Sequence, residues 1–152
     1  MKKLVLVAAL VGFALMAQAQ LVQKEDGKYY DQKDQLYTGT YIEYFPSGNK
    51  RIEMKVVDGE MNGITTLYFN NQQKQEERAF TQNAMDGTWI TWHENGTKVG
   101  EANYTNGQKD GKWLIWDEKG TLRYEMFYTD GQKTGTWSIY NEAGDLVSKR
   151  DY

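Results

Sequence analysis

Four glutamates recur at a fixed interval and are the first candidates for chemistry in this sequence. Glu53, Glu77, Glu101 and Glu125 stand 24 residues apart. Paired carboxylates about 5–9.5 Å apart can hydrolyse glycosidic bonds, and converging carboxylates can bind Ca²⁺. Two strands per repeat at ~4.8 Å would place successive members about 10 Å apart, too far to share one ion. We therefore expect a structural role, in turns or in pairs with Lys and Arg, and no metal site.

The other residues with catalytic potential stand alone. The sequence has one histidine, His93, and no cysteine. Neither a second histidine nor a nucleophile elbow accompanies His93, so no Ser-His-Asp arrangement can be argued. The lack of cysteine excludes a thiol nucleophile, a disulfide, a cysteine-ligated zinc site and an iron–sulfur cluster. We predict that the protein is not an enzyme and uses no cofactor.

Tryptophans are the strongest candidates for a binding surface. They fall into two columns, one holding Trp89, Trp113 and Trp137 and the other Trp92 and Trp116. Flat aromatic rows on a sheet can stack against sugar rings. The same rings can instead form the hydrophobic stripe of a thin fold, at about 25 cal/mol per Å² buried. We expect a core role first, and a face left partly exposed would still indicate a partner.

The charge balance limits the classes of partner. Lys and Arg number 18 against 21 Asp and Glu, for a net charge of −3. A nucleic-acid binder that relies on neutralising phosphates is therefore not expected. Lys50, Lys74 and Lys98 form a short basic column that can discourage strand-to-strand association. Its attraction to anionic lipids, about 1 kcal/mol per residue near the surface, predicts at most weak membrane association.

A 24-residue repeat must position all of these side chains. Five glycines lead the repeats, at Gly39, Gly63, Gly87, Gly111 and Gly135. A stretch rich in β-branched and aromatic residues follows each glycine, and a second one ends the repeat. Turn sequences such as Asn95-Gly96 and Asp130-Gly131 separate the stretches. The pattern predicts an all-β, elongated, single-layer antiparallel meander of about five β-hairpins over residues 39–152.

Alternation along the strands indicates which side chains share a face. Ile52, Met54 and Val56 alternate with charged residues, which predicts one apolar face and one mostly polar face. The two aromatic columns lie three residues apart, an odd spacing. We infer that the first strand of each repeat either carries aromatic residues on both faces or contains a bulge.

The N-terminal residues have a different character. Residues 1–19 combine Lys2 and Lys3 with an apolar run and an A-x-A site ending at Ala19, as in a secretory signal peptide. We expect cleavage after Ala19 and a periplasmic or secreted protein. Residues 20–38 contain short sequences similar to those of the repeats and are expected to form an N-terminal cap, because the terminal units of repeat proteins are atypical.

The repeat pattern resembles that of a known family. Gly87-x-Trp89-x-x-Trp92-x-x-x-Gly96 and the same pattern from Gly111 to Gly120 are similar to the MORN (membrane occupation and recognition nexus) repeat. The resemblance covers residues 39–152 and is closest to the variant found in exported bacterial proteins. It implies an elongated sheet without a shared set of catalytic residues. It also implies a scaffold or interaction module, linked in some members to membranes, and some bacterial relatives are regarded as antitoxins of toxin–antitoxin pairs.

These observations lead to one favoured function and several alternatives. We expect a non-catalytic, exported interaction module that binds a protein partner through its aromatic face or a sheet edge. The first alternative is binding of a glycan or envelope polymer through Trp89, Trp92, Trp113 and Trp116. An antitoxin-like or membrane-associated role follows from family analogy alone. An edge-to-edge homodimer is also open.

Overall fold

The computed structural model describes residues 21–152 of the 152-residue chain. The predicted signal peptide, residues 1–19, lies outside the described residues. The strands of the described part are β1 (Val22–Gln23), β2 (Tyr29–Tyr30), β3 (Gly39–Tyr44), β4 (Lys50–Val57), β5 (Glu60–Met61), β6 (Gly63–Tyr68), β7 (Lys74–Thr81), β8 (Ala84–Trp92), β9 (Lys98–Thr105), β10 (Gln108–Lys109), β11 (Gly111–Trp116), β12 (Leu122–Thr129), β13 (Gln132–Tyr140) and β14 (Leu146–Asp151).

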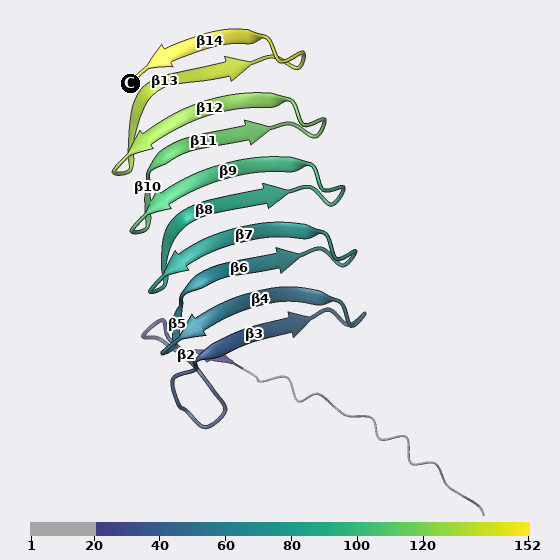
Figure 1. The fold of residues 1–152 in the computed structure, drawn as a ribbon, viewed down its shortest axis with the longest axis vertical. Coiled ribbons are helices and arrows are strands. Elements are labelled where there is room, and N and C mark those ends of the chain that lie inside the picture. The colour runs from purple at the N-terminus through teal and green to yellow at the C-terminus, as the bar shows by residue number, and fades with distance from the viewer. Residues whose placement is uncertain (1–20) are drawn as a thin grey trace, which may run out of the picture.

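A single open antiparallel sheet contains the strands from β3 to β14. The sheet follows chain order, with the short β5 and β10 continuing alongside β4 and β9. Figure 1 shows the hairpins stacked one above the next, from β3 near the N-terminal segment to β14 at the C-terminus. All hairpin turns lie along one side of the stack, and the connections between repeats lie along the other. The predicted meander of β-hairpins is confirmed.

Each hairpin turn has a residue with a left-handed backbone conformation at the same position. In four hairpins this residue is a glycine, at Gly48, Gly96, Gly120 and Gly144, with φ between 81° and 87°. In the second repeat Gln72 takes the position with a φ of 70°. Glycine adopts this conformation without steric cost, whereas a residue with a Cβ is strained there. The second repeat thus keeps the turn geometry of the others with a less suitable residue.

Two-residue turns with positive φ connect each hairpin to the next. Asp58-Gly59, Asn106-Gly107 and Asp130-Gly131 form three of them, as their sequences predict. Gln82-Asn83 forms the fourth, although it lacks the glycine that predicts the other three. The Asn83 side chain helps by accepting a hydrogen bond from the backbone N–H of Met61 at 2.7 Å. This contact comes from the preceding connection, so no local dipeptide signal reveals it.

A β-bulge interrupts every hairpin just before its second aromatic column. In the fourth repeat Ile115 pairs with Tyr124, but Trp116 pairs with Leu122, which leaves Arg123 as the extra residue. The same shift recurs in the other four hairpins. Because the extra residue belongs to the second strand, the first strand keeps its alternation and carries aromatic side chains on both faces. The first of the two alternatives inferred from the odd spacing therefore holds for the first strand, and the bulge lies on the second strand instead.

Few side chains are deeply buried, because no second layer covers the sheet. Met54, Val56 and Tyr128 are the buried hydrophobic residues of the described part. Val56 is the one with no exposed surface, and it lies two residues before the Asp58-Gly59 turn that contacts the N-terminal segment, residues 21–38. That segment attaches to the β4–β5 turn, where Tyr29 N–H donates to Gly59 O at 2.8 Å and Gly59 N–H donates to Tyr37 O at 2.8 Å.

Candidate functional site

Six aromatic rings form a continuous ladder across the last three repeats. Neighbouring ring centroids lie 4.6–6.0 Å apart, with planes tilted by 32–58°. The ladder consists of Trp89, Tyr104, Trp113, Tyr128, Trp137 and Tyr152. Such tilted pairs contribute about 0.5–1.5 kcal/mol each beyond the area they bury. The first tryptophan column and the tyrosines that end the second strands therefore make one structure, which we call the aromatic ladder, on what we call the ladder face.

Cationic side chains lie over the rings of the ladder. Lys109 Nζ is 4.4 Å from the ring centroid of Trp113 and 4.8 Å from that of Tyr128. Lys133 repeats this arrangement one repeat later, 4.7 Å from Trp137 and 4.8 Å from Tyr152. Within residues 21–152, neither lysine forms a salt bridge. The ladder face thus combines apolar rings with positive charge that no acidic side chain of the described residues pairs with.

Indole hydrogen bonds fix two of the three ladder tryptophans. Trp113 Nε1–H donates to Asn103 O and Trp137 Nε1–H donates to Phe127 O, each at 3.0 Å. Trp89 Nε1 is buried without a partner in the described part of the chain. Arg78, which is paired with Glu76, lies over the Trp89 ring at 4.4 Å. The ladder therefore begins at an end where one polar atom is unsatisfied.

The second tryptophan column lies on the opposite face of the sheet. Trp92 and Trp116 are three residues from Trp89 and Trp113 along regularly alternating strands. Their neighbours also differ, since Lys74 Nζ lies 6.0 Å from the Trp92 ring and Lys98 Nζ lies 5.3 Å from the Trp116 ring. The five tryptophans considered as a binding set therefore do not form one surface: three belong to the ladder face and two to the other.

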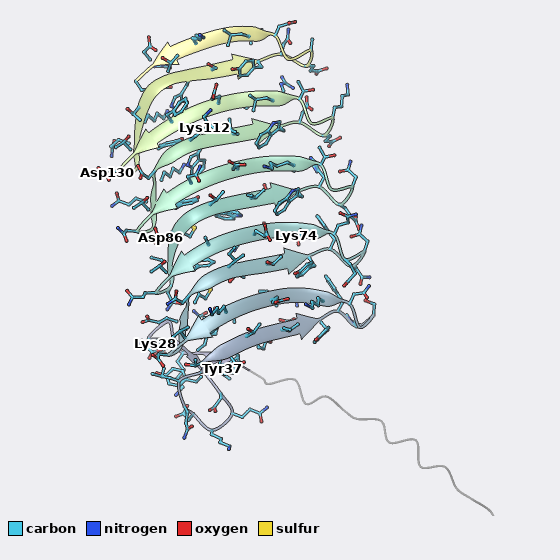
Figure 2. All side chains as sticks on the ribbon, viewed as in Figure 1. Lys28, Tyr37, Lys74, Asp86, Lys112 and Asp130 are labelled. Atoms are coloured by element: carbon cyan, nitrogen blue, oxygen red, sulfur yellow. The ribbon has the colours of Figure 1, made fainter. Side chains whose placement is uncertain are left out.

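The glutamate column is part of that other face, and each member is paired with a lysine. The pairs are Lys50–Glu53 at 2.7 Å, Lys74–Glu77 at 2.5 Å, Lys98–Glu101 at 2.8 Å and Lys112–Glu125 at 2.6 Å. Figure 2 shows Lys74 and Lys112 on strands of different repeats, with Asp86 and Asp130 on the side of the stack where successive repeats are connected. The predicted pairing of the glutamates with basic residues is confirmed.

Hydrogen bonding and burial shift the acidity of groups on both faces. The hydrogen bond from Lys112 holds the pKa of Glu125 below its usual value, and Tyr140 Oη adds a 3.3 Å hydrogen bond. On the ladder face, burial raises the pKa of Tyr104. The two shifts have opposite causes, since hydrogen bonding favours the charged form of Glu125 whereas burial favours the neutral form of Tyr104.

An exposed apolar row runs beside the ladder, across three adjacent strands. Ile115 pairs with Tyr124, and Tyr124 pairs with Ile139. Their exposed fractions are 38%, 42% and 39%. Shallow hollows of about 320 and 390 Å³ lie at the two ends of this row. Side chains that could be covered by a partner are therefore gathered on the ladder face of the last three repeats.

The remaining candidates do not assemble into a reactive centre in the described residues. His93 opens a hairpin turn, with its backbone N–H bonded to Thr97 O and its carbonyl accepting from Gly96. Across residues 21–152, no three His, Asp or Glu side chains are grouped closely enough to hold a metal ion. Over the same residues, no helix is long and apolar enough to cross a bilayer.

Comparison with known proteins agrees with the repeat geometry. A search of curated proteins finds no match. The model of the family described as "MORN repeat variant" matches residues 37–58, 85–106 and 109–130. Each matched segment contains one hairpin or most of one, and the second and last hairpins lie outside the matches. The chain is therefore a MORN repeat protein of the variant family, with three matched repeats within its five hairpins.

Proposed function

We propose that the protein is a non-catalytic, exported interaction module that binds a protein partner against its ladder face. The observation that carries the proposal is the exposed row of Ile115, Tyr124 and Ile139, on the same face as Lys109 and Lys133, which form no salt bridge within residues 21–152. Single exposed apolar side chains are common on protein surfaces, but here the repeat register brings three of them side by side on adjacent strands. Covering such a row removes apolar surface from water at about 25 cal/mol per Å².

Glycan binding has less support as an alternative. Stacking against a sugar needs an open ring face, and Trp89, Trp92, Trp113 and Trp116 each have a cation over the ring, two of them with a further ring alongside. These four residues also divide between two faces of the sheet. A ligand on one face would contact at most two of them.

The open edge at β14 favours a second mode, addition of a partner strand. All six residues of β14 are exposed, including Leu146 and Val147 at 48% and 58%. At the opposite edge, the Tyr37 hydroxyl donates to Thr40 O of β3 at 3.0 Å and so occupies an outward carbonyl. Strand addition, whether by a partner or by a second copy, is therefore expected at β14 rather than at β3.

Site-specific photo-crosslinking in the producing cell tests the proposal. A benzophenone amino acid replaces Tyr124 on the ladder face, Val147 on β14, or Ile64 on the opposite face as the control. Ile64 is the fair comparison because its exposed fraction of 58% is at least as large. We expect a discrete adduct from position 124 and none from position 64. Equal labelling from all three positions, or adducts from none, would contradict the proposal, and an adduct from position 147 alone would move the interface to the edge.

Export is tested separately by mass spectrometry of the chain from its producing cell. We expect an N-terminus at Gln20. A cytoplasmic chain that keeps Met1 would contradict the export prediction and make the antitoxin-like alternative the better one.

A further inference from the structure

One glycine in the sheet is not explained by backbone conformation. Gly100 lies in the middle of β9, and it is the only glycine of residues 21–152 without a positive φ. A glycine inside a strand weakens the strand and often marks a place where a ligand approaches closely. The added Cβ of another residue would meet only Thr91 Oγ1 at 3.0 Å and Leu114 O at 3.8 Å. The strand itself could therefore accommodate a side chain after a small adjustment of Thr91.

The other repeats confirm that this position normally carries a side chain. The residues 24 and 48 positions away, in the same register, are Ile52, Glu76, Tyr124 and Ser148. The next position on the same face is Ala102 in β9, where the other repeats have Met54, Arg78, Met126 and Arg150. Two small residues in succession thus replace two larger ones, and only in β9.

The missing side chains leave a hollow on the ladder face. It has a volume of about 320 Å³ and is lined by Trp89 and Trp113 from the neighbouring strands, with Thr91 and Ile115 beside Gly100. That volume lies at the low end of the range for ligand pockets, about 300–1,000 Å³. Its surface is almost entirely apolar. A sugar would bury hydroxyl groups here without hydrogen-bond partners, whereas an aromatic side chain would not.

The charge near the hollow indicates which type of residue should lie next to an aromatic side chain bound in it. Lys109 pairs in register with Tyr104, which lines the hollow, and its ammonium group lies over Trp113. It has no acidic partner in the described residues. The earlier repeats have Met61 and Met85 at the equivalent position. The positive charge therefore appears in the repeat where the hollow opens, and it is complementary to a carboxylate.

We propose that the Gly100 hollow receives an aromatic side chain of an extended partner segment, and that an acidic residue next to that side chain pairs with Lys109. The inference rests on the proposed function and specifies the chemistry of the partner. An aromatic anchor in an apolar hollow with a charged neighbour at its rim is a common basis for hot spots in protein interfaces.

Defined synthetic peptides test the proposal by fluorescence polarisation. The probes are short Asp- and Ser-rich peptides with one central Trp or Phe, together with versions that carry central Ala, or Lys in place of Asp. Gly100→Tyr fills the hollow with the side chain that the next repeat has at Tyr124, so the variant should fold. Ser148→Tyr is the matched control, because it adds the same ring at the equivalent position of β14. Lys109→Met restores the residue of the earlier repeats.

The expected result has three parts. The acidic aromatic peptides bind, and the central-Ala and lysine versions bind at least about tenfold more weakly. Gly100→Tyr lowers the affinity by at least about tenfold, while Ser148→Tyr changes it less than about twofold. Lys109→Met weakens binding and reduces its dependence on salt concentration.

Other outcomes overturn the inference. Failure of every peptide to bind, or unchanged binding to Gly100→Tyr, removes the hollow as the anchor site. Concentration-dependent self-association that Gly100→Tyr abolishes would assign the hollow to a second copy of the chain. If the peptides fail but the adduct from position 124 persists in the crosslinking experiment, the hollow inference is wrong and the proposed function stands.

Discussion

The first two repeats and the last three share one backbone plan but stabilise it with different side chains. In residues 39–86 the buried hydrophobic side chains are aliphatic, Met54 and Val56, and they pair with Tyr41 and Gly39 of β3. In residues 87–152 the aromatic ladder forms the packed part of the sheet, with Tyr128 as its most buried ring. The difference shows that hairpin turns and bulges define this fold, while the packing on the ladder face can change from repeat to repeat.

The boundary between the two regions is the least well satisfied part of the sheet. Thr65 occupies the ladder column in the second repeat and pairs with Arg78, which in turn pairs with Trp89. Both buried side-chain atoms that lack a hydrogen-bond partner in residues 21–152, Thr65 Oγ1 and Trp89 Nε1, lie on this row. The second repeat also supplies Gln72 at the glycine turn position and falls outside the family matches. The repeat whose sequence departs furthest from the others is thus the one with local defects.

Removing a ring from the middle of the ladder should have the largest effect. Trp113→Ala removes two ring contacts at 5.2 Å, an indole hydrogen bond and the ring beneath Lys109. We expect the free energy of unfolding in urea to fall by about 3–5 kcal/mol. Trp92→Ala, which alters the other face, should cost less because no ring stacks on Trp92 in the described part of the chain. Equal losses for the two variants would contradict the ladder as the main core of the C-terminal region.

Deleting the cap should destabilise the N-terminal repeats alone. Removal of residues 21–36 exposes the surface near Val56 and should lower local stability there by about 1.5–3 kcal/mol. Because each repeat mainly contacts its neighbours, the effect should fade along the chain. Hydrogen exchange should therefore show faster exchange in β3 to β6 and unchanged protection in β11 to β13. Faster exchange throughout the sheet would show that the two regions unfold as one unit.

Repairing the second repeat should produce a smaller gain. Gln72→Gly relieves a side chain held at a φ of 70°, and we expect an increase in the free energy of unfolding of about 0.5–1 kcal/mol. Gly96→Gln is the reverse substitution in the third repeat and should cost a similar amount. Thermal or urea unfolding measures both. A stability loss in Gln72→Gly would mean that the Gln72 side chain stabilises the turn in a way its conformation does not reveal.

Acid should weaken the Lys112–Glu125 ion pair slightly. The pKa of Glu125 is lowered in the folded chain, so this group stabilises the fold at pH values above its unfolded pKa, near 4.5, and loses that contribution as the pH falls through the folded value. Because the Lys112–Glu125 pair is partly exposed, we expect only about 0.2–1 kcal/mol. Lys112→Met should flatten this part of the stability–pH curve. A curve identical to that of the unmodified chain would show that the ion pair contributes nothing.

The sequence alone determined the fold class, the number of hairpins and most of the turns. Asp-Gly and Asn-Gly dipeptides and a strict 24-residue period depend on local backbone preferences, which a single sequence displays directly. The pairing of Glu53, Glu77 and Glu101 with lysines was also predictable, because both residue types recur at fixed positions, whereas the partner of Glu125, Lys112, comes from the neighbouring strand. Gln82-Asn83 escaped prediction because its turn is supported by a hydrogen bond from Met61 in the preceding connection.

Only the tertiary structure decided how the aromatic columns are used. The sequence placed Trp89 and Trp92 in one candidate binding set, but the bulge opposite this stretch lies on β9, so residues 89–92 of β8 alternate regularly and the two rings project from opposite faces. The hollow at Gly100 is also a product of the tertiary structure, because it is lined by tryptophans from the neighbouring strands β8 and β11. Local patterns specify which residues form strands and turns. The surface that they build depends on register between strands, which is set by contacts between residues distant in sequence.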